Sequence, residues 1–334
     1  MAHSNISIFV PHIGCPHMCA FCNQRTITGT EKIPRSGDVK RVCAKALQEI
    51  KKPAEAEIAF FGGSFTAVPR EYMLELLESA QDFIGDGKFK GIRISTRPDY
   101  IDDEVLKILK TYGVTSIELG AQSMVDRVLE ANERGHTALD VANAVKLIKS
   151  YDCFELGLQM MVGLYKSTPD DEKTTWNRIT ELSPDTVRIY PVVILEDTKL
   201  GDLFKSGEYK PVDFETVVDL CTDFLTDAEK RNINVIKLGL HASEVVELQM
   251  LGGFYHPAFR ELCEGRRYRR EFEKEIGKHG SNIKYAEFLV PERNISKAYG
   301  QKKRNAEYFR NLGIRLKISS DKNLTERYMT VNIR

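Results

Sequence analysis

The sequence predicts an α/β fold built on parallel strands, because short apolar runs alternate with amphipathic segments about six times along most of the chain. Repeats of this kind favour parallel strands joined by right-handed crossovers. Two architectures fit, an α/β barrel or a doubly wound sheet. The expected strands are residues 5–10, 57–61, 91–95, 114–119, 154–162, 186–193 and 233–238.

Start and stop signals support the helices expected between these strands. Pro69 stands where the first residue of a helix is expected. Asp102 is placed to cap the next helix, and Gly113 is placed to end it. Thr137 and Asp140 have the spacing of a capping box. Each helix is therefore predicted from a local signal as well as from apolar periodicity.

Composition excludes several classes of protein. With 334 residues, 42% hydrophobic and 29% charged, the chain can bury one large core or two modest ones, which argues against disorder. The mean hydropathy of -0.33 and the short first apolar run, residues 6–10, argue against a membrane protein or a secretory signal. Seven cysteines, three of them within eight residues, do not resemble a secreted disulfide framework. We therefore expect a cytoplasmic protein.

The charge of the chain is unevenly distributed, although 48 basic residues balance 48 acidic ones. Residues 265–334 contain 18 Lys or Arg and 8 Asp or Glu, and the preceding residues contain 30 and 40. We therefore expect a main domain over residues 1–264 and a basic C-terminal extension over residues 265–334.

The basic extension interleaves aromatic residues with its positive charge. Residues 266–270 are Arg-Arg-Tyr-Arg-Arg, and the basic residues 302–304 are followed by Tyr308 and Phe309. Such a surface can bind RNA by phosphate neutralisation and base stacking. Equally, these charges could cover the acidic part of the chain or form solvated helix faces.

Cys15, Cys19 and Cys22 form the strongest local motif, in the loop expected after the first strand. Three thiolates at this spacing can hold three irons of a [4Fe-4S] cluster and leave the fourth iron open. An open iron can coordinate the amino and carboxylate groups of S-adenosylmethionine (SAM) and pass an electron to its sulfonium, which breaks a carbon–sulfur bond and gives a 5'-deoxyadenosyl radical. The alternatives are a zinc site completed by His12 or His17, or three structural thiols.

Polar residues and glycines follow several of the expected strands. They are Gly62, Gly63 and Ser64 after the second strand, Ser95 to Arg97 at the third, Gln122 and Ser123 after the fourth, and Gln159 in the fifth. The carboxyl ends of parallel strands share one rim, where ligands bind. This recurrence predicts a site built from several strands, although turns also favour Gly and Ser.

These residues carry a resemblance to a known family. Cys15, Cys19 and Cys22, with Phe21 before the last cysteine, resemble the radical SAM signature. Between residues 5 and 265 the chain is similar to the radical domain of the Elongator catalytic subunit in its runs 60–65, 95–100, 117–123, 134–137 and 187–191. Residues 238–241 also resemble relatives of oxygen-independent coproporphyrinogen oxidase.

The resemblance implies a partial (β/α)6 TIM-like barrel rather than a doubly wound sheet. It also implies a [4Fe-4S] cluster bound by the three cysteines, SAM as the second cofactor and a reducing electron donor as a partner. The backbone of Phe21 would lie near the adenine. The backbone of Gly62 and Gly63 would receive the methionine amino group.

Five side chains match positions that the family uses for SAM. Arg134 would pair with the SAM carboxylate, for which its planar fork is suited; the alternative is a surface arginine at a helix end. Gln122 and Gln159 match positions associated with the ribose hydroxyls. Ser64 and Ser95 stand at cofactor positions but depart from the acidic residue or Thr, and from the Glu, that relatives have there.

We expect a radical SAM enzyme that abstracts hydrogen from a substrate, first of all a tRNA, given the basic extension and the Elongator-like runs. Only some 70 residues follow Gly265, short for the acetyltransferase domain that Elongator appends. The alternatives are a radical enzyme acting on a small metabolite or a peptide, and a non-enzymatic iron–sulfur sensor or a carrier of a cluster or another cofactor. The sequence identifies no catalytic residue beyond the cofactor site.

Overall fold

The chain forms two compact units. The structure is a computed structural model that describes residues 4–10, 13, 15, 18–23 and 32–334. The first unit contains Met1–Val212 and Asn232–Tyr255, and the second contains Asp213–Arg231 and His256–Arg334. The second unit therefore combines the basic end of the chain with a helix from the stretch that the sequence analysis assigned to the main domain.

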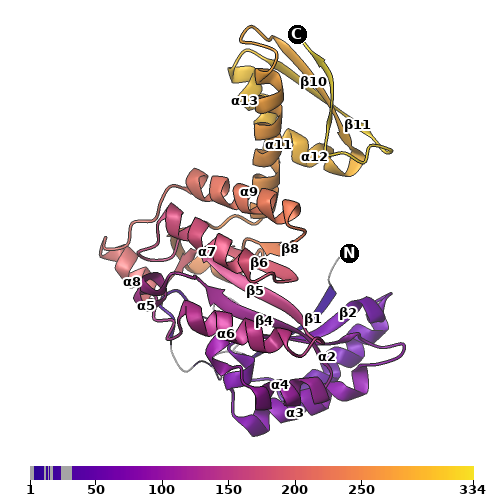
Figure 1. The fold of residues 1–334 in the computed structure, drawn as a ribbon, viewed down its shortest axis with the longest axis vertical. Helices are drawn as coiled ribbons and strands as arrows, with labels where there is room; N and C mark the ends of the chain where they lie inside the picture. Colours follow the sequence, from indigo (N-terminus) through magenta and orange to yellow (C-terminus); the bar gives the residue numbers. More distant parts are fainter. Residues whose placement is uncertain (1–3, 11–12, 14, 16–17, 24–31) are drawn as a thin grey trace. The chain divides into compact units, whose positions relative to one another are not determined.

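A curved, parallel seven-stranded sheet forms the first unit (Figure 1). Its strands are β1 (Ser4–Val10), β2 (Ala56–Gly62), β3 (Gly91–Thr96), β4 (Val114–Gln122), β5 (Glu155–Val162), β6 (Thr186–Pro191) and β8 (Asn234–Leu238). They pair in the order β1-β2-β3-β4-β5-β6-β8. A doubly wound sheet would reverse its order at a switch point, whereas this order runs steadily in one direction. The predicted TIM-like barrel class is therefore confirmed, with seven strands rather than the six of a (β/α)6 repeat.

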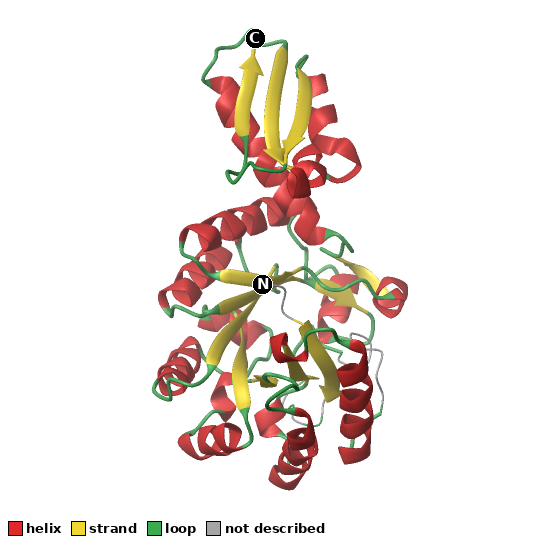
Figure 2. Cartoon of the chain, turned by 90° about the vertical axis from the view of Figure 1, so that its right-hand side faces the viewer, coloured by secondary structure: helices red, strands yellow, loops and turns green. Residues whose placement is uncertain are grey.

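Helices cover the outside of the curved sheet, as Figure 2 shows. They are α2 (Ser36–Glu49), α3 (Arg70–Ala80), α4 (Asp103–Thr111), α5 (Asp126–Ala131), α6 (Ala138–Lys149), α7 (Pro169–Glu181) and α8 (Lys199–Lys205). A small antiparallel pair, β7 (Val193–Leu195) and β9 (Met250–Gly253), and helix α10 (Glu244–Gln249) complete the unit. In the described part of the chain, no helix has the length and apolar character needed to cross a membrane.

Local signals set the helix ends largely as predicted. Asp102 caps α4 by accepting a hydrogen bond from the backbone N–H of Val105 at 2.7 Å. Thr137 and Asp140 form the expected capping box at the start of α6. Pro69 is the N-cap residue of α3 rather than its first helical residue, since its extended ψ of 134° precedes the helix.

A buried charge network fills the inside of the sheet near the amino ends of the strands. Arg93, in β3, is fully buried and donates to Glu57 at 2.8 Å, to Glu118 at 3.1 Å and to Glu155 at 2.6 Å. These carboxylates come from β2, β4 and β5. Burial alone would raise the pKa of Glu57, but Arg93 and two hydroxyl donors together hold that pKa below its ordinary value.

Contacts between distant strands show how far the sheet curls. The guanidinium of Arg188, in β6, lies 5.2 Å from the ring centre of Phe61, in β2, although three strands separate β2 from β6. Both side chains must therefore point into the concave interior. Arg188 also donates twice to Glu118, at 2.6 and 2.8 Å, which joins it to the network around Arg93.

The second unit packs helices against a three-stranded sheet. Its elements are α9 (Phe214–Lys230), α11 (Phe259–Gly277), β10 (Tyr285–Pro291), α12 (Ile295–Tyr299), α13 (Arg304–Asn311), β11 (Arg315–Asp321) and β12 (Met329–Ile333), with the strands in the order β11-β10-β12. Its core centres on Phe272 of α11 and Phe288 of β10, whose rings stack with centroids 4.0 Å apart.

Acidic residues of α9 neutralise three of the four arginines in the run 266–270 of α11. Arg266 pairs with Glu215 and Asp219, and Arg270 bonds Asp219 at 2.8 Å. Arg267 pairs with another α9 carboxylate, that of Glu229. Because α9 brings more acid than base, the second unit as a whole has 21 basic and 16 acidic residues, a smaller excess than residues 265–334 alone. These ion pairs agree with the alternative in which the charges of the run cover an acidic surface.

Candidate functional site

The carboxyl ends of β1 to β4 meet at one rim of the first unit. The backbone N–H of Gly63, just after β2, donates to the carbonyl of Val10, the last residue of β1, at 2.8 Å. The hydroxyl of Ser64 lies 2.8 Å from that of Thr96, the last residue of β3. These bonds close the rim beside the loop that carries the cysteines.

Bonds to two helical elements hold the described part of the cysteine loop. Its Ala20 N–H donates to the carbonyl of Asn132, at the end of α5, at 3.1 Å. The Ala20 carbonyl accepts from Leu200, in α8, at 2.7 Å, and Cys22 N–H donates to the Cys19 carbonyl at 3.0 Å. The loop segment with Cys19 and Cys22 is therefore anchored from both sides. His12 and His17, the candidate zinc ligands, lie outside the described residues.

The three cysteines are partly buried and lie among positive charges. None of the three forms a disulfide within the described part of the chain. Burial raises the pKa of Cys15, while the Ser64 backbone N–H and the charges of Arg134 and Arg97 oppose that rise. Two guanidinium groups therefore stabilise negative charge at this loop.

Arg134 connects the cysteine loop to the rim. One Nη donates to the sulfur of Cys19 at 2.9 Å, and the other donates to the carbonyl of Gly120, in β4, at 2.8 Å. Its guanidinium also lies 6.0 Å from the ring centre of Phe21. Arg134 is only 6% exposed, so the alternative of a surface arginine is wrong. Gly120 leaves room for a neighbouring rim side chain, because a Cβ there would lie 3.0 Å from Nε2 of Gln122.

The last residue of β2, Gly62, has a backbone conformation that favours glycine. Gly62 has a φ of +111°, which L side chains rarely adopt, and a Cβ there would lie 3.0 Å from the Val10 carbonyl oxygen. Ser64 is buried, and its hydroxyl also accepts from the backbone N–H of Arg97 at 3.1 Å. Within the described structure this hydroxyl therefore ties β2 to β3.

The two glutamines at the rim have different surroundings. Gln122 has a φ of 63°, and its buried Oε1 has no hydrogen-bond partner among the described residues. Gln159 donates to Glu118 at 2.9 Å and to the hydroxyl of Ser95 at 3.2 Å. The amide of Gln159 is thus anchored to the charge network, whereas that of Gln122 keeps a free acceptor.

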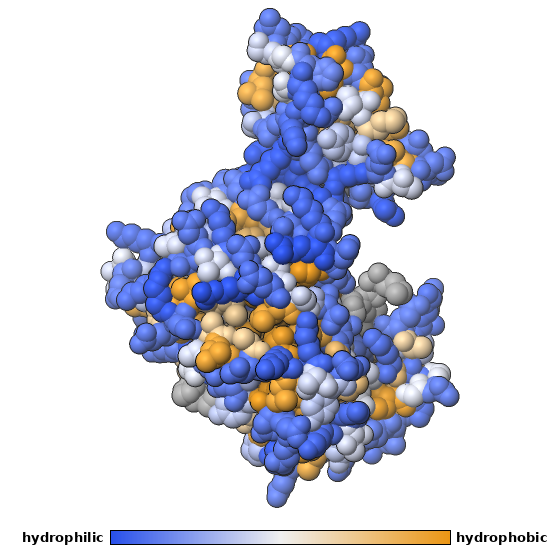
Figure 3. Space-filling view, in the orientation of Figure 1, coloured by the Kyte–Doolittle hydropathy of each residue, from blue (hydrophilic) through white to orange (hydrophobic). Residues whose placement is uncertain are grey.

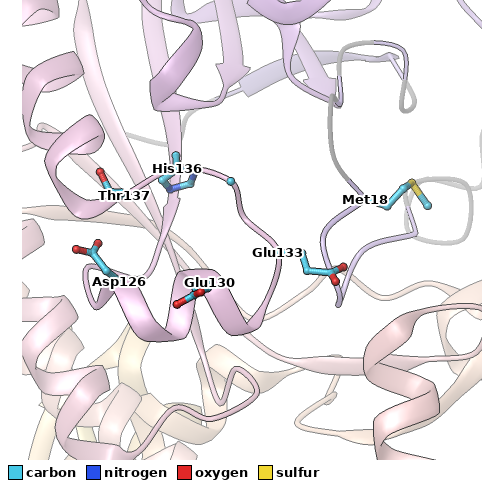
Figure 4. Close-up of a pocket in the computed structure, with 7 residues that line it drawn as sticks. Met18, Asp126, Glu130, Glu133, His136 and Thr137 are labelled. Carbon is cyan, nitrogen blue, oxygen red and sulfur yellow. The ribbon is translucent and has the colours of Figure 1, made fainter.

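His136 follows Arg134 and lines a hollow of about 760 Å³. Burial and the nearby charge of Arg134 lower the pKa of His136 to about 4, so its imidazole is neutral at pH 7. Its Nε2 lies 3.2 Å from the Ala121 carbonyl and must carry the proton, which leaves a buried Nδ1 without a partner among the described residues. Figure 4 shows Asp126 and Glu130 of α5 lining the same hollow, with Met18 of the cysteine loop.

These residues fit a cluster and SAM. Unsatisfied buried polar atoms are rare in proteins, yet the described part of this rim has three: Gln122 Oε1, Arg134 Nε and His136 Nδ1. The described residues contain no group of three or more His, Cys, Asp or Glu side chains arranged around a single ion. The thiolates of a [4Fe-4S] site bind separate irons, so they need not converge on one point.

Comparison with known families decides which family the chain belongs to. Residues 9–175 match the radical SAM superfamily, and residues 184–269 match the radical SAM C-terminal domain. The chain belongs to the radical SAM superfamily. It is therefore an enzyme of the class that uses a [4Fe-4S] cluster and SAM, as the sequence predicted.

Of three curated relatives that are similar to this chain, two agree with the predicted Elongator resemblance. An uncharacterized protein of Methanocaldococcus jannaschii is 31% identical over 232 residues, which cover 64% of this chain and 68% of that protein. The tRNA uridine(34) acetyltransferase of Methanocaldococcus infernus is 25% identical over 64% of this chain and 48% of its own length. Human Elongator complex protein 3 is 30% identical over 51% of this chain and 35% of its own length. The chain thus spans half or less of the latter two relatives.

Solved structures confirm the fold. The M. infernus Elp3 structure superposes with a TM-score of 0.63 at 18% identity, over 83% of this chain and 63% of that one. Coproporphyrinogen III oxidase from Escherichia coli gives a TM-score of 0.51 at 16% identity, over 69% of this chain and 53% of that one. Both resemblances expected from the sequence are therefore confirmed at the level of the fold.

The structure also places residues near the rim to which the sequence analysis gave no individual role. Glu118 accepts hydrogen bonds from both Gln159 and Arg188. Arg97, only 5% exposed, is fixed by two bonds of 2.9 Å to Asp99. A signal for Glu118 and Arg188 was available, because each is a charged residue inside an apolar strand and must face other polar groups. His136 had no such signal, since its burial depends on Arg134 and β4.

Proposed function

We propose that this radical SAM enzyme removes a hydrogen atom from a tRNA substrate held at the rim of the first unit. The observation that supports the cofactor site in this proposal is the position of Arg134, which donates to both the Cys19 sulfur and the Gly120 carbonyl. That bridge brings a proposed cluster ligand and the strand-end residues into one site. Support for tRNA comes from the similarity to the tRNA uridine(34) acetyltransferase of M. infernus over 255 residues.

In this proposal each described residue has a defined task. Cys15, Cys19 and Cys22 hold three irons of the cluster, which together with SAM supplies the hydrogen-abstracting radical chemistry. Arg134 orients the SAM carboxylate through its planar fork. The carbonyl groups of Gly62 and Gly63 accept from the methionine amino group, a contact that needs no side chain.

The remaining side chains position the nucleoside half of SAM. Gln122 offers its unpartnered Oε1 to a ribose hydroxyl, and Gln159 is held for the same task by Glu118. The backbone of Phe21 lies near the adenine. Ser64 and Ser95 act through their neighbours, because their hydroxyls are already bonded to Thr96 and Gln159.

The proposal places the enzyme in the cytoplasm, where tRNA and reducing electron donors occur. Its test is anaerobic incubation of the reconstituted protein with dithionite, SAM and unfractionated tRNA. We expect 5'-deoxyadenosine from the wild type, more of it with tRNA, and a nucleoside of altered mass after digestion of the RNA. Cys19→Ala should form none of these products, and Cys153→Ala, at an exposed cysteine outside the site, is the matched control.

Two results would contradict parts of this proposal. If 5'-deoxyadenosine forms but its yield ignores tRNA and no nucleoside changes, the substrate is not tRNA, and a metabolite or a peptide takes its place. If Cys19→Ala cleaves SAM as well as the wild type does, the three cysteines do not hold the cluster.

A further inference from the structure

The second unit contains a hollow of about 590 Å³ whose charged lining residues are mostly basic. Its charged lining residues are five cations, Lys284, Lys302, Lys303, Arg310 and Arg315, and one acid, Glu307. All lie within the second unit, on α13, on β11 and in the segments before α13 and β10. Much of the surface of this unit is hydrophilic in the view of Figure 3.

Most of these cations have no carboxylate partner. Among the described residues, no ion pair involves Lys284, Lys302, Lys303 or Arg315, and Arg310 has a long contact of 3.3 Å with Glu307. Arg266, Arg267 and Arg270 of α11 differ, since carboxylates of α9 neutralise them. Like charges gathered on a concave wall repel one another and create a positive potential that attracts an anion. Part of the excess charge of the basic extension therefore lies at this hollow rather than on the paired arginines of α11.

The turn that presents two of the lysines is held in a fixed shape. Lys302 and Lys303 both have left-handed backbones, with φ values of 53° and 60°. Asn305, which is 4% exposed, donates to the carbonyls of Gly265 and Ala298, each at 2.8 Å. Such conformations persist only when the surroundings impose them, and they are common at ligand-binding sites.

The same turn is pressed closely against α11. A Cβ on Gly265 would lie 3.1 Å from the Cα of Gly300, and a Cβ on Gly300 would lie 3.2 Å from the side chain of Asn305. The Lys303 N–H donates to the Gly300 carbonyl at 2.9 Å, which closes the turn. The two lysine side chains therefore project from a rigid support while remaining exposed.

The spread of the cations favours an extended polyanion over a small one. A small anion is bound by donors that converge on one point, whereas these charges are distributed over a hollow formed by several segments. A nucleic-acid backbone presents a row of phosphates at regular spacing and is bound largely by such Lys and Arg contacts.

We propose that this hollow, through Lys284, Lys302, Lys303, Arg310 and Arg315, binds the phosphate backbone of the RNA substrate. The proposal rests on the proposed tRNA function and assigns RNA binding to one face of the second unit. It assigns no such role to the paired arginines of α11. Contacts of this kind position the RNA and carry no base specificity.

The test measures the affinity of the reconstituted enzyme for unfractionated tRNA at several salt concentrations. Each lost phosphate contact should make the slope of log affinity against log salt shallower by about 0.7–0.9. Lys302→Gln/Lys303→Gln should therefore lower the slope by about 1.6 and weaken binding about 40-fold at 0.1 M salt. Circular dichroism and the unfolding midpoint check that the exposed substitutions leave the fold intact.

The control is Lys274→Gln/Lys322→Gln, which removes the same charge from exposed positions of the same unit outside the hollow. We expect this variant to bind within about twofold of the wild type. If the two variants lose affinity equally, only overall charge matters and the hollow is not the binding site. If the hollow variant instead loses binding to phosphatidylserine vesicles while keeping tRNA affinity, the hollow binds a membrane surface and the proposal is wrong.

Failure of this inference can be told apart from failure of the proposed function. If the wild type modifies tRNA and Lys302→Gln/Lys303→Gln binds tRNA with unchanged affinity, only the proposed role of the hollow is wrong. A wild type that neither binds tRNA nor changes it overturns both.

Discussion

Replacing Arg93 with methionine should destabilise the first unit by about 3–5 kcal/mol, because it leaves buried carboxylates without their cation. Arg93 is fully buried, and Glu57, its partner at 2.8 Å, is 2% exposed. Glu118 keeps the two bonds from Arg188, so the main loss falls on Glu57. For a protein of ordinary stability, about 5–15 kcal/mol, this is a large fraction of the total.

Urea unfolding, monitored by tryptophan fluorescence, measures this loss of stability. Trp176 is the one tryptophan of the sequence, and it lies buried on α7 in the same unit as Arg93. With a denaturant slope of about 2 kcal/mol per molar, the midpoint should fall by about 1.5–2.5 M.

Two comparisons sharpen the test of the charge network. Glu57→Gln added to Arg93→Met should restore part of the loss, because it removes the unpaired charge. In the single variant, burial without Arg93 should raise the pKa of Glu57, so the loss should be smaller at pH 5 than at pH 8. A single variant that loses less than about 1 kcal/mol, or a double variant that is no more stable than the single one, would refute the reasoning.

Three further predictions concern the rim and its support. Arg134→Lys keeps the positive charge but loses the planar guanidinium, which donates through both of its Nη atoms. SAM affinity measured by equilibrium dialysis should therefore fall about 10- to 100-fold. An unchanged affinity would contradict the role given to the guanidinium. Gly62→Ala should lower both SAM affinity and the thermal midpoint, because Gly62 has a φ of +111°, whereas Gly37→Ala, which places its Cβ in open space on α2, should leave both nearly unchanged. Burial raises the pKa of Glu172 from 4.5 to about 7, so between these pH values the folded state keeps a proton that the unfolded state has released. The unfolding midpoint should therefore fall as pH rises from about 4.5 to 7. Glu172→Gln should flatten this fall, and an unchanged pH profile would show that Glu172 is not its source.

Strand positions were predictable because burial on both faces leaves continuous apolar runs. The expected strand at 57–61 corresponds to β2, and the one at 233–238 corresponds to β8. The helix caps were predictable because Asp102 and Thr137 bond backbone groups only three residues away. These features depend on neighbours in sequence.

The charge network depends on residues far apart in sequence. Glu118 and Arg188 are 70 positions apart, and only closure of the sheet brings them together. The pairing of α9 with α11 likewise joins residues some 40 to 50 positions apart, which is why the arginine run could not be separated beforehand from an RNA-binding surface. The structure now distinguishes the neutralised run from the unpaired lysines at the hollow.

Much of the candidate site was predictable, because the cysteine spacing and the strand-end residues are local in sequence. Their mutual arrangement was not, since Arg134 and Cys19 are 115 positions apart. The roles of the individual SAM contacts remain predictions drawn from the family resemblance.

Electron paramagnetic resonance of the reduced, anaerobically reconstituted protein tests the central claim most directly. If Cys15, Cys19 and Cys22 leave one iron without a protein ligand, adding SAM should shift the signal of the cluster, and Arg134→Lys should require more SAM for the same shift. A protein that contains zinc at these cysteines, or a cluster whose signal is the same with and without SAM, would contradict the account.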